Sequence, residues 1–277
     1  MKVNKIVFYI IVISIVFLCI GPFVWLLITS LKTNQEIYSL PVTYIPENIS
    51  LGAYREVFAN KKFLIYVVNS VIVSAVTTIA CLCIALLAAY GIARIKMRHK
   101  RLLEFSLLLV TLFPQIIFLV PLYTLMAKLH VLNHPLGLVI PYVAFSLPLA
   151  VWVLVGFFKT IPRELEEQAM IDGLSNFKIL TKIIIPLSWP GIATAAILIF
   201  IGPFAWNEFL FSLSFMIQDS SRTVPVGIAM LSGSSMYETP WNQICAAVVM
   251  TTIPLILFVL AFQKRIVEGL TKGAVKG

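Results

Sequence analysis

Residue types that carry metal or nucleophilic chemistry are few in this chain and do not cluster. The four cysteines all lie in apolar runs, at spacings that fit neither a C-x-x-C redox pair nor a zinc site. The three histidines, His99, His130 and His134, lie near loops without a second ligand at a suitable spacing. The sequence therefore predicts free thiols that are buried as small hydrophobic groups, no bound metal or cofactor, and no catalytic residue.

The chain also lacks a nucleotide-binding loop. Such a loop requires the pattern G-x-x-x-x-G-K-[ST], whereas the tail has Gly269, Gly273 and Gly277 without the Gly-Lys-Ser/Thr step. The sequence therefore predicts no nucleotide-binding loop of this kind in the chain itself.

The loop 159–186 is long and has a pattern of its own. Pro162 suits the start of a helix over 163–171, whose positive dipole end is complemented by three carboxylates, those of Glu164, Glu166 and Glu167. Asp172 and Gly173 end this helix, and a second amphipathic helix is predicted by apolar residues at spacings of three and four, namely Leu174, Phe177, Leu180 and Ile184. We expect a helix–turn–helix with one apolar side and exposed carboxylates, and a loop of this length and structure indicates a binding partner.

Composition places these motifs in a membrane protein. Hydrophobic residues make up 60% of the 277 residues and charged residues only 12%, whereas soluble domains contain about 45–50% and about 25%. The apolar residues form six runs, each close to the ~20 residues that cross a bilayer. The first run is longer than the apolar core of a signal peptide, so we expect it to be retained. We predict one all-α domain over 1–277 with six spans, approximately 6–31, 64–93, 105–126, 136–158, 187–213 and 241–262.

The distribution of charge predicts the topology. The N-terminus, 94–104, 159–186 and 263–277 together hold 15 of the 21 lysines and arginines. Basic loops stay in the cytoplasm, so we expect both termini to be cytoplasmic. The basic residues do not form a stripe with interleaved aromatic residues, which argues against nucleic-acid binding.

The loop resembles the EAA loop of ATP-binding cassette (ABC) importer permeases, whose pattern is E-A-A-x₃-G-x₉-I-x-L-P. Five positions match at the right spacing, and Gln168 and Ile185 replace an alanine and a leucine. The matching positions are Glu167, Ala169, Gly173, Ile183 and Pro186. The chain is most similar to the maltose-type carbohydrate permeases, on three segments (145–148, 157–162 and 206–209) and the tail 269–277.

The resemblance implies roles for two groups of residues. In that family the loop is a coupling helix that docks on the ATPase subunit, which here would involve Glu166, Glu167, Ala169, Asp172, Gly173 and Pro186. The tail would reach the ATPase dimer through Gly269, Thr271, Gly273, Lys276 and Gly277.

The resemblance also implies a type I ABC importer permease fold in a prokaryotic cytoplasmic membrane. The expected partners are a second, different permease subunit, two copies of an ATPase that binds ATP and Mg²⁺, an extracellular sugar-binding protein and the lipid bilayer. The chain itself would bind no cofactor and catalyse nothing. A permease for a non-sugar solute, or an ion-coupled carrier, are the alternatives; one clear intramembrane carboxylate, Glu208, gives the carrier little support.

Trp206, Asn207 and Glu208 remain open to two interpretations. Asn207 and Glu208 could bind sugar hydroxyls or the binding protein, and Trp206 could stack on a sugar ring. Alternatively, the polar pair is held near the lipid headgroups or bonded to another helix, and the tryptophan is an interface anchor.

Overall fold

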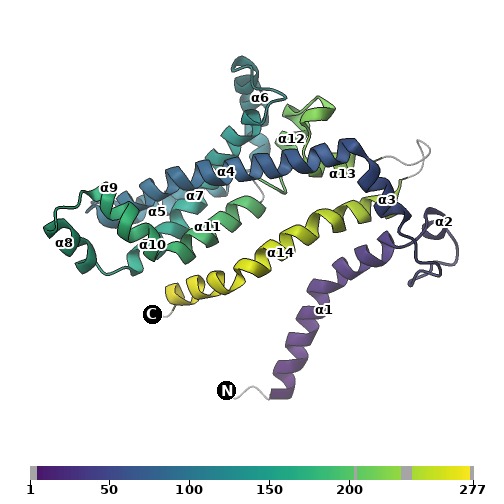
Figure 1. The fold of residues 1–277 in the computed structure, drawn as a ribbon, viewed down its shortest axis with the longest axis horizontal. Helices are drawn as coiled ribbons and strands as arrows, with labels where there is room; N and C mark the ends of the chain where they lie inside the picture. Colours follow the sequence, from purple (N-terminus) through teal and green to yellow (C-terminus); the bar gives the residue numbers. More distant parts are fainter. Residues whose placement is uncertain (1–4, 203–204, 232–238, 275–277) are drawn as a thin grey trace. The chain divides into compact units, whose positions relative to one another are not determined.

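The regular elements of this protein are helices throughout the part of the chain that the structure, a computed structural model, describes (Figure 1). That part comprises residues 5–202, 205–231 and 239–274. The prediction of an all-α protein is confirmed. The chain divides into two compact units: unit 1 is 1–64 with 227–254, and unit 2 is 65–226 with 255–277.

Unit 1 contains three helices at the start of the chain and the first half of a late one. Their bounds are Lys5–Ser30 (α1), Asn34–Ile37 (α2), Gly52–Ala59 (α3) and Trp241–Ala274 (α14). The Ser30 and Tyr54 hydroxyls lie 2.6 Å apart and join the end of α1 to α3. Gln243 of α14 donates to the Glu56 carboxylate of α3 at 2.5 Å. Side-chain hydrogen bonds between elements therefore hold this unit together.

Unit 2 is built on long helices with shorter ones at both ends. The longer helices are Lys61–Arg94 (α4), Lys100–Thr111 (α5), Leu136–Thr160 (α7) and Trp189–Ile201 (α11). Helix α7 packs against both α5 and α11. One end, which we call the loop end, carries Glu164–Ile171 (α8), Asn176–Ile179 (α9) and Ile185–Leu187 (α10) (Figure 1). The other, which we call the far end, carries Leu119–Lys128 (α6), Leu210–Phe215 (α12) and Val224–Ala229 (α13).

The helices follow three of the predicted spans closely and depart from the others. The long apolar helices are Ile6–Ser30, Lys61–Arg94 and Leu136–Thr160, and two bent pairs could each form one more span by length and composition. The predicted span 105–126 is one such pair, because its chain bends by 83° between Lys100–Thr111 and Gln115–Lys128. Pro114 lies at this bend; it has no N–H to donate and disfavours helical geometry at the preceding residue.

The predicted span 187–213 is also interrupted. Helix α11 ends at Ile201, and a turn precedes α12. A bend of 82° separates Asn176–Leu187 from Trp189–Ile201, with Pro190 in the first turn of α11. In the sixth predicted span the apolar part of α14, Trp241–Leu257, is shorter than in the long helices.

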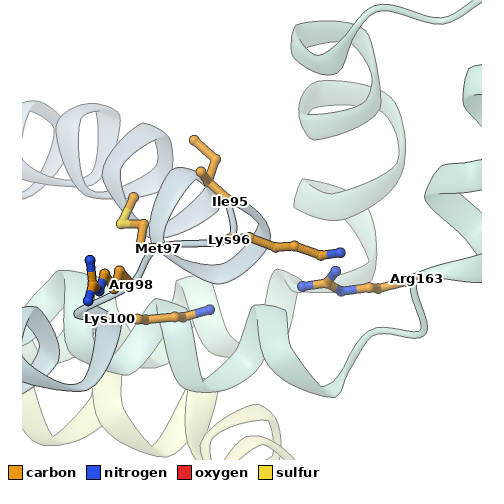
Figure 2. A pocket seen from close by; sticks show the side chains of 6 residues that line it. All are labelled: Ile95, Lys96, Met97, Arg98, Lys100 and Arg163. Atoms are coloured by element: carbon orange, nitrogen blue, oxygen red, sulfur yellow. The ribbon is translucent and has the colours of Figure 1, made fainter.

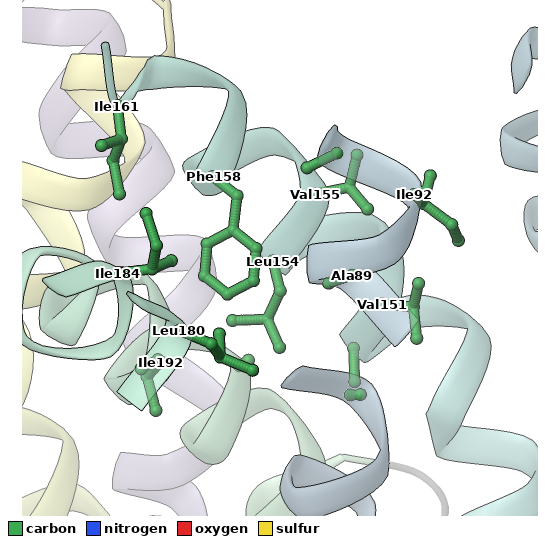
Figure 3. Close-up of a cluster of buried hydrophobic side chains, with 14 of the residues drawn as sticks. Ala89, Ile92, Val151, Leu154, Val155, Phe158, Ile161, Leu180, Ile184 and Ile192 are labelled. Carbon is green, nitrogen blue, oxygen red and sulfur yellow. The ribbon is translucent and has the colours of Figure 1, made fainter. Parts of the chain in front are cut away.

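A core at the loop end joins α4, α7, the loop helices and α11 (Figure 3). Phe158, Leu154 and Ile184 are fully buried there. Ala85, Ala89 and Ala93 of α4 are also buried in this core. Their small side chains allow other helices to approach α4 closely, and in this structure those helices belong to unit 2. Two of the four cysteines, Cys81 and Cys245, are buried as predicted, whereas Cys19 and Cys83 are exposed.

A close contact between α7 and α11 generates the first prediction. A Cβ built on Gly191 would lie 2.3 Å from Cγ of Phe157, so the glycine lets the two helices approach. We expect Gly191→Ala to lower the stability of the purified protein by about 1–3 kcal/mol through overpacking. The measurement is thermal unfolding in detergent.

Gly156 of α7 provides the matched control, since a Cβ there meets nothing within 4 Å. Gly156→Ala is expected to be neutral or stabilising. Equal melting temperatures for the two variants would show that the α7–α11 contact does not depend on the glycine.

Candidate functional site

Helix α8 begins at Glu164, directly after the residues in which the sequence predicted a helix start. Its first turn contains Glu164, Glu166 and Glu167 and no basic residue. Negative charge at this position stabilises the positive end of the helix dipole. The predicted helix over 163–171 and the observed α8 therefore agree to within one residue.

The end of α8 has the geometry of a Schellman motif. Gly173 has φ of +81°, which favours glycine because a Cβ is strained there. The N–H of Gly173 donates to Met170 O and that of Leu174 to Ala169 O, both at 3.0 Å. The prediction that Asp172 and Gly173 end this helix is confirmed, and the motif leaves both residues exposed at the corner of the loop.

The second part of the loop is helical from Asn176 to Leu187, with a π-helical turn over Leu180–Ile184. Ile179, Leu180 and Ile184 are buried in the core at the loop end. Phe177 is 66% exposed, so the predicted apolar face is wrong at this position. In the same turn Ile179 faces the core instead, and residues two apart on an α-helix point in nearly opposite directions, so Phe177 is turned outward.

The predicted coupling residues divide between two faces of the loop. Glu167, Asp172, Gly173 and Pro186 are exposed and lie on the free surface of the chain. Ala169 is buried in the core at the loop end, and Glu166 is only 4% exposed. The prediction of exposed carboxylates is therefore wrong for Glu166, because neighbouring residues on a helix point about 100° apart and Glu166 turns inward.

Glu166 is buried because it forms an ion pair with Arg94, the last residue of α4. The hydroxyl of Tyr90, one turn earlier on α4, donates to the same carboxylate at 3.2 Å. The Arg94 guanidinium also donates to the carbonyl of Ile161 at 3.2 Å. Sequence reasoning missed these partners, since it used Arg94 only as a charge in the topology count.

A second, more exposed ion pair lies nearby. Lys159 at the end of α7 donates to both carboxylate oxygens of Glu104 on α5, at 2.8 and 2.9 Å. The Lys159 side chain is 44% exposed, so water screens this pair. The loop end is thus held to α4 by a buried ion pair, while an exposed one joins α5 and α7.

Glu208 is buried at the far end, where it is bonded to two helices. Its carboxylate accepts the N–H groups of Phe211 at 2.7 Å and Ser212 at 3.0 Å, at the start of α12. It also accepts a hydrogen bond from the hydroxyl of Tyr142 on α7. In this structure Glu208 therefore holds α12 against α7, which agrees with the interpretation of a polar residue bonded to another helix.

The two neighbours of Glu208 have different environments. Trp206 is buried and stacks on Phe200, with ring centroids 5.9 Å apart. Asn207 is exposed, and its amide donates to the carbonyl of Ile201 at 2.5 Å, where α11 ends. Of the three residues considered for sugar binding, only Asn207 is exposed in the described structure.

The predicted tail contacts lie at the edge of the described chain. Gly269, Thr271 and Gly273 lie in the last turns of α14. Lys276 and Gly277 lie outside the described residues. The tail therefore stays a prediction.

The buried pair of Arg94 and Glu166 generates the second prediction. Arg94→Met or Glu166→Met leaves one buried charge without its partner, so we expect each to lower stability by about 3–5 kcal/mol. The double variant removes both charges and should recover most of this loss. The measurement is a double-mutant cycle in thermal unfolding.

The exposed pair Lys159 and Glu104 is the control, for which Lys159→Gln should cost less than about 1 kcal/mol. If the Arg94 and Glu166 single variants cost no more than this control, the ion pair does not fix α8 to α4.

The contact between Tyr142 and Glu208 generates the third prediction. Tyr142→Phe removes a donor from a buried carboxylate, and we expect a loss of about 1–3 kcal/mol in stability.

Tyr123→Phe is the control, because among the described residues the Tyr123 hydroxyl has no hydrogen-bond partner. Stability is measured by thermal unfolding, beside solute uptake in cells. If Tyr142→Phe abolished solute uptake while the thermal stability of the protein stayed unchanged, the result would instead favour a solute-binding role for Glu208.

Comparison with known proteins places this arrangement in a family. Residues 2–272 match the family model described as "Binding-protein-dependent transport system inner membrane component". The chain is 40% identical to the sulfoquinovosyl glycerol transport system permease protein SmoH of Agrobacterium fabrum, over 92% of this chain and 88% of that protein. It is also 40% identical to the trehalose transport system permease protein SugB of Mycobacterium tuberculosis, over 92% of each chain.

The trehalose/maltose transport system permease protein MalG of Thermococcus litoralis is 40% identical over 94% of this chain and 92% of its own length. Among solved structures, a chain of a bacterial ABC transporter involved in alginate import has the same fold. Its TM-score is 0.78 at 20% identity, with 94% of this chain and 95% of that chain covered. The expected ABC importer permease fold is therefore confirmed.

The family model covers nearly the whole chain, and relatives that align over about nine tenths of their own length are 40% identical to it. The chain thus belongs to the binding-protein-dependent transport system inner membrane components, and it is a multi-pass membrane permease rather than an enzyme.

Proposed function

We propose that this chain is one of two permease subunits of an ATP-driven sugar importer. The observation that carries the proposal is the division of the loop 159–186 into two faces. Its inner face is bonded to α4 and packed into the core at the loop end, and its outer face presents Glu167, Asp172 and Gly173. A surface that is anchored to the bundle in this way suits the transmission of movement from a partner to the bundle.

The substrate class is supported by the relatives. Those with 40% identity are named for trehalose, trehalose/maltose and sulfoquinovosyl glycerol transport. All three names describe carbohydrate compounds, so a sugar or glycoside is the solute we propose for this chain. A permease for a non-sugar solute, the first alternative, receives no support from these names.

The partners follow from the same proposal. A binding protein delivers the sugar outside the cell; a related structure contains an alginate transporter with a periplasmic protein bound to alginate pentasaccharide. A second permease subunit completes the path, and two ATPase subunits dock on the two coupling loops. ATP and Mg²⁺ bind to the ATPase subunits, whose closure tilts the permease helices and opens the path outward.

The orientation in the membrane is part of the proposal. The loop 159–186 and the loop 94–104 carry 9 of the 21 lysines and arginines. Because basic loops are retained in the cytoplasm, the loop end faces the ATPase and both termini are cytoplasmic.

The fourth prediction tests the docking surface. Glu167→Lys reverses an exposed charge, and Gly173→Val places a β-branched residue at φ of +81°. We expect each to reduce co-purification of the ATPase subunit at least about tenfold, while membrane insertion is unchanged. The measurement is affinity purification of the transporter from membranes, with quantitative immunoblotting of each subunit.

Glu164→Lys is the matched control, since Glu164 lies in the same turn, is exposed and is outside the matched pattern. Undiminished co-purification of the ATPase with both Glu167→Lys and Gly173→Val would contradict the docking role. Solute uptake by liposomes that contain only this chain would support the ion-coupled carrier instead.

A further inference from the structure

The loop end of unit 2 has a basic hollow that the proposed function does not use. It has a volume of about 430 Å³ and lies between the segment that joins α4 to α5 and the residue before α8 (Figure 2). Its lining residues are Ile95, Lys96, Met97, Arg98, Lys100 and Arg163.

The charge of this hollow is of one sign. Four of its six lining residues are cationic, and no acidic residue lines it in the described chain. Lys96 and Arg163 extend toward one another from opposite sides (Figure 2). Like charges that converge repel each other unless an anion lies between them.

Two carboxylates near the hollow are paired with other cations. Glu166 pairs with Arg94, and Glu104 pairs with Lys159. Lys100 donates to the carbonyl of Ala93 at 3.0 Å. Within the described residues, the Lys96, Arg98 and Arg163 side chains form no ion pair. Two further carboxylates lie near Arg163 in the sequence: Glu164, which lines an adjoining hollow of about 530 Å³, and Glu167, whose N–H donates to the Arg163 carbonyl.

The backbone adds to the positive potential. Helix α5 begins at Lys100, its N-cap residue His99 makes no capping hydrogen bond, and its first turn contains no acidic residue. The first N–H groups of a helix and its dipole favour an anion. A third hollow of about 670 Å³ at this helix end is lined by Arg101 and also by Glu104, which is paired with Lys159.

The position of the hollow indicates the source of the anion. It lies between the end of the apolar helix Lys61–Arg94 and the start of the bent apolar pair at Lys100. Ile95 and Met97 give its wall an exposed apolar part. An anion with attached acyl chains satisfies both features, because its chains can follow the apolar helices while its head occupies the hollow.

We propose that this hollow binds the phosphate headgroup of an anionic phospholipid. The inference goes beyond the transport role and requires only that the loop end lies at a bilayer surface. Retention of basic loops in the cytoplasm depends on the number of charges, whereas a binding site depends on where they lie. Variants with equal charge loss at different positions therefore separate the two explanations.

The experiment titrates the purified full-length chain with phosphatidylglycerol, phosphatidylcholine and inorganic phosphate, using native mass spectrometry in a neutral detergent. We expect phosphatidylglycerol to bind in preference to phosphatidylcholine. Arg98→Gln with Arg163→Gln should weaken its binding about fivefold for each cation removed. Lys178→Gln with Lys182→Gln is the control, because both lysines are exposed on the same loop and lie outside the hollow.

Three results would overturn the proposal. Equal weakening in the control would mean that total charge governs binding. Displacement of the lipid by millimolar inorganic phosphate would identify a free anion as the ligand. Loss of the lipid whenever the ATPase subunit is bound would assign the cations to an acidic surface of that protein. None of these measurements depends on sugar uptake, so their outcome is separate from that of the proposed function.

Discussion

The burial of Glu166 against Arg94 is the constraint on which the loop end depends. An ionised carboxylate in a packed core requires an opposite charge and hydrogen bonds, and Arg94 and Tyr90 supply both from one face of α4. This contact fixes the rotation of α8 about its axis. Once Glu166 points inward, the helical period turns Glu167 to the free surface. Glu166 therefore binds α8 to α4, whereas the adjacent Glu167 is exposed and available to a partner.

At the far end a buried carboxylate is also fully bonded, but there it satisfies backbone groups at a break between two helices. Helix α11 stops at Ile201, so polar backbone groups are exposed where the next short helix begins. Glu208 accepts the N–H groups at the start of α12, and Asn207 donates to the carbonyl at the end of α11. These side chains satisfy an interrupted backbone inside an apolar protein. A carboxylate in such a span therefore need not bind a transported ion or solute.

The sequence predicted most of the helices because apolar length and turn chemistry are local properties. The end of α8 at Asp172 and Gly173 was predictable because glycine lacks a Cβ and adopts a positive φ without strain. This property does not depend on distant parts of the chain. The inward rotation of Glu166 was not predictable, since it depends on Arg94, which is distant in the sequence. Phe177 was misplaced because apolar residues follow one another so closely here that the pattern does not decide which of them face the core, and Ile179 takes the inward position. The break after Ile201 was missed because the apolar run continues through it.

The basic hollow adjoins the coupling loop at two points of the chain. Arg163 lines the hollow and directly precedes α8, while Arg94, one residue before Ile95 of the hollow, anchors Glu166. A bound headgroup would place a negative charge between Arg163 and the segment 95–100, and so reduce the repulsion between the two sides of the hollow. The same ligand would then hold the end of α4 close to the start of α8. In that arrangement the lipid reinforces the connection through which a docked ATPase would move the bundle.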